Sequence, residues 1–324
     1  MPNFSRRGPD DRPPARSASS GEFVAPSGAF RSRGSSDGPR DPKPRSTFAA
    51  ADHPAGEGGT EAPPLPGSRS GPARSDELKL CGLAAVRARF ARDPGSIKRL
   101  FFDHATGQRV GPICKVLAQE KKVYRQVEPA ELEKISGSIH HGGIVAVVYA
   151  PPLRTPTAGD VRAWAKRGEA LLVLDRIGNA HNLGAVARTA AFFGVPRLVI
   201  PDAPTAARPS DAAHRVAEGG FEHLEVWLAK DLVEFARELV SAGYEVVGAA
   251  TRGAASLRGG ERKADKAERK PVALFMGNEE HGLAPEVIAV CTRLVTIPGS
   301  GKVESLNVSV AASILIWELL ARRV

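Results

Sequence analysis

The feature that most constrains the fold is a series of short, continuously apolar segments in the second half of the chain, with helical segments between them. Strands that are apolar on both faces are buried on both faces, which is typical of a parallel sheet covered by helices on each side. The sequence therefore predicts an α/β domain over residues 169–324. Its predicted strands are 171–175, 197–200, 244–251, 272–277 and 293–297, and its predicted helices are 182–194, 231–243, 284–291 and 305–322.

Helical and strand patterns also alternate upstream, over residues 75–150, which predicts a smaller α/β unit. This unit begins with an amphipathic helix near 78–90 and ends with an apolar strand within 142–150. The proline-rich segment 151–168 is predicted to be a linker. Residues 1–74 hold 13 of the chain's 26 prolines and lack apolar periodicity, so they are predicted to be a disordered tail. The tail either attracts RNA weakly or is a solvated arm.

The net charge and the cysteines indicate which kind of partner the chain binds and which cellular compartment it occupies. The formal net charge of +9 over 324 residues favours a polyanionic partner such as nucleic acid. The three cysteines are far apart and form no CxxC pair, and the histidines have no ligand spacing, so neither disulfides nor a metal site is expected. There is no apolar leader, and the C-terminal apolar run is interrupted by Ser309, Ser313 and Glu318, so no membrane span is expected. Together these features favour a cytoplasmic protein.

The segment GSGK at 299–302 is similar to the end of a phosphate-binding P-loop, but two required positions differ. The first glycine of such a loop would fall at Thr296, and the Ser or Thr that reaches Mg²⁺ would fall at Val303. A nucleoside triphosphate site is therefore not predicted. The first strand of the domain is followed by LDRIGNAHN, which lacks the glycine pattern of an ordinary dinucleotide-binding fold.

Polar side chains gather instead in three loops that follow predicted strands, which is where parallel sheets bind their ligands. Each loop also has a purely structural explanation, because asparagine and serine cap helices and glycine forms turns. Arg188 is harder to explain as a solvated charge, since its helix neighbours are small and apolar. The residues concerned are Asn182 and Arg188 in the first loop and its helix, Gly277 and Glu279 in the second, and Ser305 and Asn307 in the third.

The three segments HNLGAVARTAAFFG, GNEEHGL and IPGSGKVESLNVSVA, in this order, resemble the signature motifs of the SpoU/TrmH family of RNA 2'-O-ribose methyltransferases, within the SPOUT superfamily. The resemblance covers about residues 171–324. The upstream unit, with LCGLAAV and HHGGIVAVV, is similar to the family's small RNA-binding domain. It has His-Gly-Gly-Ile at 141–144 where the usual pattern is His-Gln-Gly-Ile, which leaves details of RNA contact open.

The resemblance implies a fold and a cofactor. The fold is a trefoil-knotted α/β domain, an exception to the rule that chains do not thread loops. The cofactor is S-adenosylmethionine, and the resemblance implies that the loop containing GSGK wraps this molecule rather than a phosphate. The residues expected to bind it are Thr251, Gly277, Ile297 and Leu306.

The resemblance also implies roles for the polar residues and a homodimer. Arg188 is the family's candidate for activating the ribose hydroxyl, and because a guanidinium stays protonated we expect it to orient the hydroxyl and stabilise negative charge. Glu279 would hold loops or position that arginine, Asn182 and Asn307 would fix the ribose and the loop, and Ser305 would shape the site. The dimer contacts are expected on the C-terminal helix and the helix that starts at Asn182.

Four points stay open from the sequence. The chain could be a non-catalytic RNA-binding or ribosome-assembly factor on a methyltransferase fold, although retention of the polar residues of all three loops argues against this. It could methylate a base rather than a ribose. The substrate is expected to be ribosomal RNA of the 23S type, with tRNA as the second candidate. The basic segment 252–270 either follows an RNA backbone or is a solvated insertion.

Overall fold

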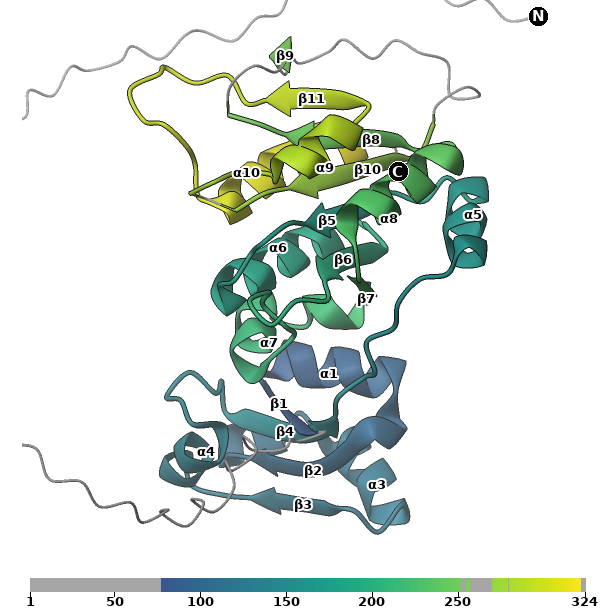
Figure 1. Cartoon of the computed structure of the whole chain (residues 1–324). Helices are drawn as coiled ribbons and strands as arrows, with labels where there is room; N and C mark the ends of the chain where they lie inside the picture. The colour runs from purple at the N-terminus through teal and green to yellow at the C-terminus, as the bar shows by residue number, and fades with distance from the viewer. Residues whose placement is uncertain (1–76, 252–254, 257–269, 279, 322–324) are drawn as a thin grey trace, which may run out of the picture. The chain divides into compact units, whose positions relative to one another are not determined.

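The computed structural model describes residues 77–251, 255–256, 270–278 and 280–321 (Figure 1). The predicted tail 1–74, Glu279 and most of the basic segment 252–270 therefore lie outside the described residues. The described residues contain two β-sheets, and both belong to the same compact unit of the chain.

The smaller sheet has four strands in the order β1-β4-β2-β3. The bounds of its strands are β1 (Glu77–Cys81), β2 (Ile97–Phe102), β3 (Val123–Gln126) and β4 (Ile144–Tyr149). The central strand β4 pairs antiparallel with both β1 and β2, and β3 adds to the edge parallel to β2. The helices of this part are α1 (Leu83–Arg92), α2 (His104–Gly107), α3 (Gly111–Gln119) and α4 (Pro129–Ser136), with a 3₁₀ turn η1 (Pro94–Ser96). Its core is formed around Leu80, Val86, Leu100, Leu117 and Ile144, which are all fully buried.

The predicted helix near 78–90 is wrong in its first part. Residues Glu77–Cys81 form strand β1, and the helix begins only at Leu83. The period of two between Leu78 and Leu80 is a strand pattern that the helical spacing downstream conceals. Gly82 separates the two elements, with φ of 89°, a conformation that glycine adopts without strain.

The larger sheet has seven strands in the order β7-β6-β5-β10-β8-β11-β9, and all its described strand pairs are parallel. The predicted mostly parallel sheet is therefore confirmed. Its strands are β5 (Leu171–Leu174), β6 (Arg197–Pro201), β7 (Glu225–Ala229), β8 (Glu245–Ala249), β9 (Ala255–Ser256), β10 (Val272–Met276) and β11 (Arg293–Thr296). Because all strands run the same way, the loops that follow them gather at one edge of the sheet.

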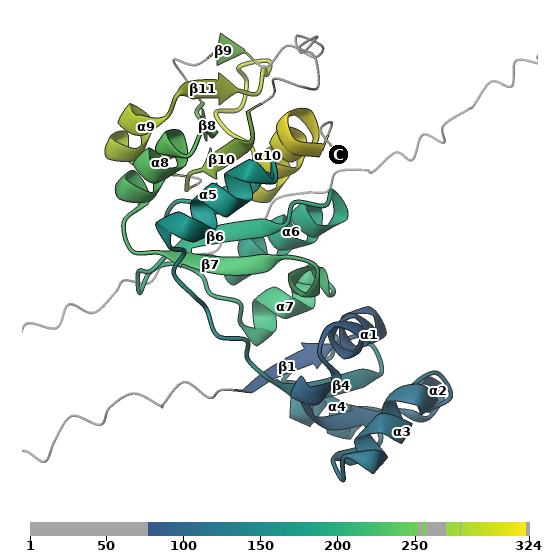
Figure 2. The ribbon, with the colours of Figure 1, turned by 90° about the vertical axis from the view of Figure 1, so that its right-hand side faces the viewer.

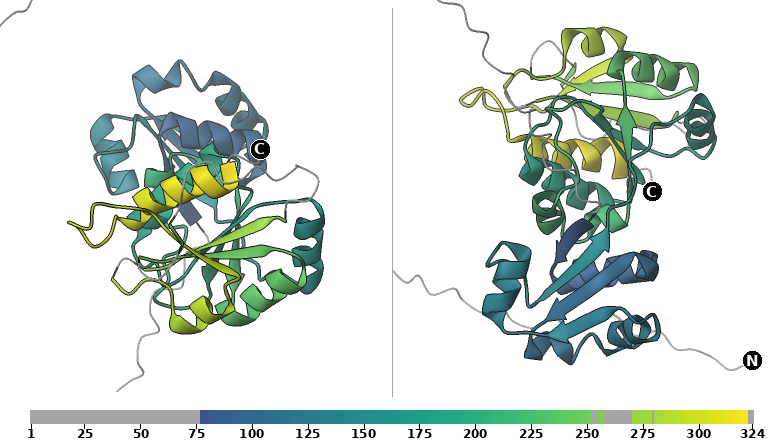
Figure 3. Two further views of the ribbon diagram at one scale, coloured as in Figure 1. Left: turned by 90° about the horizontal axis from the view of Figure 1, so that it is seen from above. Right: turned by 60° about the horizontal axis from the view of Figure 1, so that its bottom comes forward.

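Helices cover both faces of this sheet (Figures 2 and 3). Successive residues of each strand point to opposite faces, so Leu172 and Leu174 join one core while Leu171 and Val173 join the other. The first core also contains residues of α6 (Ala180–Phe192), α7 (Asp211–Ala217) and α10 (Val308–Leu315). The second contains residues of α5 (Ala158–Lys166), α8 (Leu232–Ser241) and α9 (Pro285–Val290). Burial on both faces explains why these strands are continuously apolar.

Helices α5 and α7 and strand β7 are among the elements that have no counterpart in the sequence predictions. Helix α5 lies within the predicted linker 151–168, begins with a capping box at Thr157 and Asp160, and buries Trp164 in the second core. Helix α7 and strand β7 fill the region between β6 and α8, where no element was predicted. Both are short, and β7 is only partly buried along most of its length, so their apolar pattern is weak.

The C-terminal helix starts later than predicted. Helix α10 begins at Val308 rather than at Ser305 and passes into a π-helical turn, η4 (Ile316–Leu320). Ile316, Leu319 and Leu320 are buried in the first core, so this apolar segment packs against the sheet. Over the described ranges, no helix combines the length and the apolar content that crossing a membrane requires.

A buried ion pair connects α1 to the 3₁₀ turn η2 (Gly220–Glu222). Arg89 Nη2 lies 2.8 Å from Glu222 Oε1, and both side chains are almost fully buried. Nearby, Arg92 Nη1 donates to the carbonyl of Phe221 at 2.9 Å. Removing one partner of such a pair leaves an uncompensated buried charge, which typically costs about 3–5 kcal/mol. The ion pair and the Arg92 hydrogen bond thus connect η2 to α1 at two points.

Candidate active site

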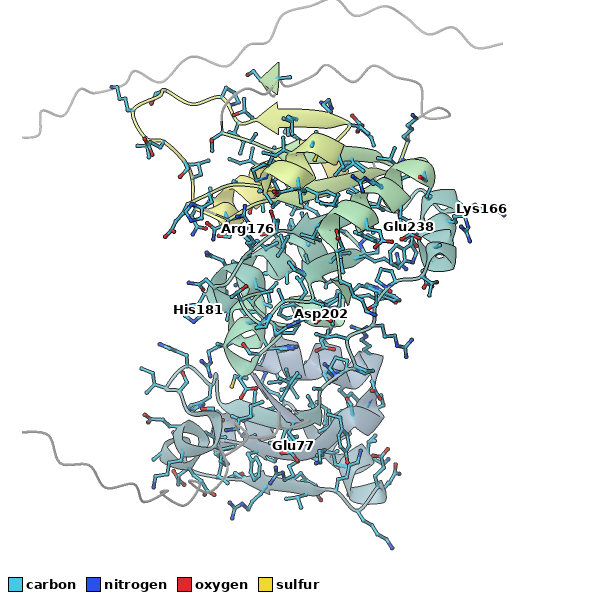
Figure 4. The ribbon with its side chains drawn as sticks, viewed as in Figure 1. Glu77, Lys166, Arg176, His181, Asp202 and Glu238 are labelled. Atoms are coloured by element: carbon cyan, nitrogen blue, oxygen red, sulfur yellow. The ribbon has the colours of Figure 1, made fainter. Side chains whose placement is uncertain are left out.

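The loop between β5 and α6, together with α6, carries the first group of predicted residues; Figure 4 labels Arg176 in this loop and His181 in the first turn of α6. Helix α6 is capped by Asn179, whose side-chain oxygen accepts hydrogen bonds from the backbone N–H groups of His181 and Asn182. Asn182 is therefore in the first turn of the helix and is not its cap. Its side chain is left to make a contact outside α6.

The first and third loops meet through two asparagines. Asn307 Nδ2 donates a hydrogen bond to Asn182 Oδ1 at 3.2 Å. Asn307 is also the N-cap of α10, because its Oδ1 accepts from the N–H of Ser309 at 2.9 Å. The expected cap role of Ser305 is thus wrong: Ser305 lies two residues before the cap and is exposed. One asparagine side chain consequently fixes both the start of α10 and its contact with α6.

A second contact aligns the same two helices further along. The hydroxyl groups of Thr189 on α6 and Ser313 on α10 are 3.2 Å apart, within hydrogen-bond distance. Helices α6 and α10 also share the first core through Val186 and Ala312. The hydrogen bond between the two asparagines therefore lies beside a packed apolar interface between α6 and α10. This interface limits how far the two loops can move apart.

Arg188 is placed differently from the two asparagines. It lies six residues beyond Asn182, about one and two-thirds turns of an α-helix, so the two side chains leave α6 in different directions. Its Nη1 atom lies 2.9 Å from Glu218 Oε1, and both side chains are more than half exposed. The sequence analysis expected Glu279 to position this arginine, and Glu279 lies outside the described residues. The carboxylate that pairs with Arg188 is that of Glu218, which the sequence analysis did not select.

The second loop follows β10 and closes tightly on itself. Asn278 and Gly282 exchange backbone hydrogen bonds of 2.8 and 3.1 Å, and Asn278 Oδ1 accepts from the N–H of Glu280 at 2.8 Å. A Cβ atom on Gly277 would lie 2.1 Å from the carbonyl carbon of Gly282. Gly277 is therefore required by the close approach of its own loop. That requirement accounts for the glycine without any ligand.

Asp175 is the functional candidate that sequence reasoning missed. It follows β5 directly, is 3% exposed, and its Oδ2 accepts a hydrogen bond of 2.7 Å from the N–H of Ala284, at the end of the second loop. The neighbouring Arg176 donates to the carbonyl of Gly282 at 3.0 Å. These bonds join the first loop to the second. The available signal was an acidic residue immediately after a fully buried strand.

The residues expected to hold the cofactor lie around three neighbouring strand ends. Thr251, Gly277 and Ile297 follow β8, β10 and β11, which are adjacent in the sheet. The chain after β8 contacts the end of β11, because Ala250 N–H donates to the carbonyl of Val295 at 2.9 Å. Leu306, at the end of the third loop, exposes 46% of its surface.

Backbone groups together with apolar side chains suit an adenosine-containing ligand, which needs hydrogen bonds at its base edge and an apolar face. Ile297 is partly buried against the first core, and Leu306 is exposed beside the loop, so both apolar side chains could contact such a base. Among the described residues, no group of three or more His, Cys, Asp or Glu side chains could hold a metal ion. The apolar side chains of Ile297 and Leu306 are of the kind that an adenosine-containing cofactor such as S-adenosylmethionine requires.

A cavity of about 830 Å³ lies away from these strand ends. Its lining includes Glu77, Arg89, Arg208 and Trp227, and none of the four residues expected to hold the cofactor contributes to it. The geometry of the loops identifies the candidate site better than the size of this cavity does, because the cavity lacks all the polar residues of the three motifs.

Helix α7, which directly precedes Glu218, carries a buried histidine. His214 is 2% exposed, and its ring centroid lies 4.7 Å from that of Phe221. Burial, together with the nearby charge of Arg89, lowers the pKa of His214 from 6.5 to about 3. The imidazole is consequently neutral at physiological pH and acts as a packing group beneath the turn that follows α7.

Comparison with known protein families gives two matches to this chain. Residues 169–317 match the family described as "SpoU rRNA Methylase family". Residues 79–153 match the family described as "RNA 2'-O ribose methyltransferase substrate binding". The first match covers the larger sheet with its helices other than α5, and the second covers the smaller sheet.

Individual proteins are similar over most of the described chain. A protein named uncharacterized tRNA/rRNA methyltransferase YfiF, from Escherichia coli O157:H7, is 32% identical over 248 residues, which are 76% of this chain and 68% of that protein. The 23S rRNA (guanosine-2'-O-)-methyltransferase RlmB of Nitrosomonas europaea is 32% identical over 238 residues, which are 73% of this chain and 88% of that enzyme.

Among solved structures, the AdoMet-bound rRNA methyltransferase from Sinorhizobium meliloti has a TM-score of 0.61 at 25% identity, covering 76% of this chain and 87% of that one. The family and the enzyme class predicted from the three motifs are confirmed by these matches. The chain belongs to the SpoU family of RNA methyltransferases.

Proposed function

We propose that this protein methylates the 2'-hydroxyl of a ribose in structured RNA, using S-adenosylmethionine as the methyl donor. The proposed substrate is ribosomal RNA of the 23S type, with tRNA as the second candidate. The single observation that carries the proposal is the hydrogen bond between Asn182 and Asn307, which joins the first and third family motifs in one site. The RlmB relative, which aligns over most of its length, supports ribosomal RNA as the substrate. The name of the YfiF relative includes both tRNA and rRNA, so tRNA is the second candidate.

In this proposal, Thr251, Gly277, Ile297 and Leu306 hold S-adenosylmethionine. When bound, that molecule supplies a methyl group on a sulfonium, which is reactive without a metal. We further propose that the chain around this site forms a trefoil knot. Two features of the fold support this: β10 lies between β5 and β8 in the sheet, and the chain after β11 returns to pack α10 against α6.

The chemistry of the acceptor determines what the polar residues must do. A ribose 2'-hydroxyl is a very weak acid, so its oxygen needs help as it becomes a nucleophile. A guanidinium has only donors and stays protonated, so Arg188 would orient the hydroxyl and stabilise negative charge on its oxygen or on the adjacent phosphate. Asn182 and Asn307 would fix the ribose and the third loop. Glu279 would hold the second loop and Ser305 would shape the site around them.

RNA binding is assigned in this proposal to the smaller unit, residues 75–150, joined through 151–168 to the catalytic residues 169–324. The match of residues 79–153 to a substrate-binding family supports this division. The tail 1–74 and the basic segment 252–270, which add positive charge to the chain, would strengthen the attraction to RNA without selecting its sequence. The proposed compartment is the cytoplasm.

We also propose a homodimer that uses the exposed faces of α6 and α10. Phe192 is 83% exposed, and Trp317 in the η4 turn is 48% exposed. Phe193 lies between them, with ring centroids 5.0 Å from Phe192 and 5.5 Å from Trp317. Such a cluster of exposed aromatic side chains is typical of an interaction surface. Sedimentation of the wild type as a dimer and of Phe192→Asp as a monomer would support this face, and a monomeric wild type would exclude it.

The function is tested by supplying labelled S-adenosylmethionine with unmodified transcripts of 23S ribosomal RNA, of 16S ribosomal RNA as a control, and of tRNA. Modified RNA is digested to nucleosides and analysed by mass spectrometry, which separates a methyl group on the ribose from one on the base. Ribose methylation of the 23S transcript is the expected result. Base methylation would refute the chemistry, and failure to modify any RNA would favour a non-catalytic RNA-binding factor.

A further inference from the structure

The turn that follows α7 places a carboxylate directly on Arg188. Helix α7 ends at Ala217, and its C-cap Glu218 has φ of 45° and ψ of 42°, in the left-handed region. Helices often end with one residue in this region, but residues other than glycine, asparagine and aspartate are uncommon there. Its carboxylate Oε1 lies 2.9 Å from Arg188 Nη1. An unusual backbone geometry thus coincides with contact to the arginine of the first motif.

The residues after Glu218 fix this turn against the helix that carries Arg188. A Cβ atom on Gly220 would lie 2.9 Å from Arg188 Cα and 3.1 Å from the carbonyl oxygen of Ala187. Gly220 is therefore needed because the turn rests directly on the α6 backbone at Arg188. Glu218 N–H also donates to the carbonyl of His214 at 3.2 Å, which closes α7 above its buried histidine.

The ion pair between Arg188 and Glu218 contributes little to the stability of the fold. Both side chains are more than half exposed, and ion pairs of this kind contribute little to folding because water screens them. What the pair does restrict is the direction of a long, flexible side chain. A guanidinium offers several N–H donors in one plane, so a carboxylate on Nη1 leaves the remaining donors for an oxygen of the substrate.

We propose that Glu218 is the positioning residue for Arg188. It holds the guanidinium by one nitrogen so that the other donors face the ribose hydroxyl or the adjacent phosphate. This inference rests on the proposed function, in which Arg188 acts on the RNA. The close packing of Gly220 fixes the backbone of the turn beside Arg188, and this keeps the Glu218 carboxylate within reach of the flexible arginine side chain.

The first test compares steady-state methylation by Glu218→Ala, Glu218→Gln and the wild type. A mispositioned catalytic group lowers turnover by about 10- to 100-fold, so Glu218→Ala should reduce kcat by about that factor with little change in the KM for RNA. Glu218→Gln keeps an oxygen that accepts from the guanidinium and should recover part of the lost activity. The variant Arg188→Ala/Glu218→Ala should be no slower than Arg188→Ala, because both changes remove the same function. Glu234→Gln, an exposed residue on α8 over the other face of the sheet, is the matched control.

A second measurement makes the inference testable without activity. Phenylglyoxal modifies accessible guanidinium groups, and peptide mass spectrometry measures the rate at each arginine. Arg188 should react faster in Glu218→Ala than in the wild type, with the other arginines unchanged. Equal rates, or an active wild type whose kcat is unaffected by Glu218→Ala, would overturn the inference. A wild type that methylates no RNA would instead contradict the proposed function, and the modification rates would still decide the role of Glu218.

Discussion

The bond between Asp175 and the second loop gives a prediction that can be worked out in detail. Asp175 is buried after β5, and its carboxylate accepts from the N–H of Ala284 at 2.7 Å. A hydrogen bond to a charged group contributes about 1.5–3 kcal/mol, and a buried donor left without a partner brings the loss to the upper part of that range or slightly beyond it. Asp175→Ala should therefore lower the free energy of unfolding by about 2–4 kcal/mol. For a domain of this size that corresponds to a decrease of roughly 4–16 °C in Tm, at about 2–4 °C per kcal/mol.

The structure offers a matched control for this variant. Asp202 follows the neighbouring strand β6 as Asp175 follows β5 (Figure 4), but its side chain is 44% exposed, and its Oδ1 lies 2.8 Å from Nη2 of the partly buried Arg208. Asp202→Ala should change stability by no more than about 1 kcal/mol. Urea denaturation of both variants, with the m-value checked for constancy, measures the difference. The reasoning would be refuted if the two variants were equally stable, because the buried bond would then contribute nothing that the pair at Asp202 does not.

The variant Asp175→Asn extends the same experiment from stability to the rate of methyl transfer. The amide keeps an oxygen that can accept from Ala284 but loses the charge near Arg176, whose Nε lies 3.4 Å from Asp175 Oδ1. We expect a smaller loss of stability than with alanine and a reduced rate of methyl transfer, because the second loop carries Gly277 and Glu279. Full activity in this variant would mean that the position of the second loop tolerates the change.

Two further predictions concern α10 and α7. Asn307→Asp keeps the oxygen that caps α10 but removes the donor to Asn182. The free energy of unfolding should therefore fall by less than the ~1 kcal/mol of a lost cap, while the rate of methyl transfer falls sharply. Equal losses of stability in Asn307→Asp and Asn307→Ala, measured by thermal melting, would contradict this separation of roles. His214 should make stability depend on pH. Because its pKa is 6.5 in the unfolded chain and about 3 when buried, its contribution is complete above pH 6.5 and is lost as the pH falls toward 3. His214→Phe should flatten that part of the profile of unfolding free energy against pH, and an unchanged slope would show that other groups cause it.

The sequence predicted those parts of the fold that depend on local pattern. Apolar runs such as Leu171–Leu174 must be buried on both faces, and this alone leads to a parallel sheet with two layers of helices. The order of the strands could not be predicted, because the insertion of β10 between β5 and β8 depends on packing among distant segments. Strand β1 was mistaken for helix because Leu78 and Leu80 adjoin a genuinely helical pattern.

The same limit applies to the candidate site, where the sequence predicts residue types but not the partners of each residue. The motifs identified Asn182 and Asn307 as separate polar residues, and their hydrogen bond joins positions 125 residues apart. Glu218 could not be found from the sequence, because its pairing with Arg188 depends on a left-handed turn packed against α6. Gly277 was selected for a ligand that approaches its backbone, whereas the structure explains it by the close approach of Gly282. Local pattern identifies residue types, and tertiary packing determines their partners.

The central claim is that the third loop, GSGKVESLN, belongs to a site for S-adenosylmethionine and not for a nucleoside triphosphate. Titration calorimetry of the purified full chain with S-adenosylmethionine, and with ATP as the control, tests it most directly. The account predicts saturable binding of S-adenosylmethionine near one site per chain or per dimer, weakened by changes at Leu306 or Ile297, and no binding of ATP. Folded protein that binds ATP, or that binds neither molecule, would contradict it.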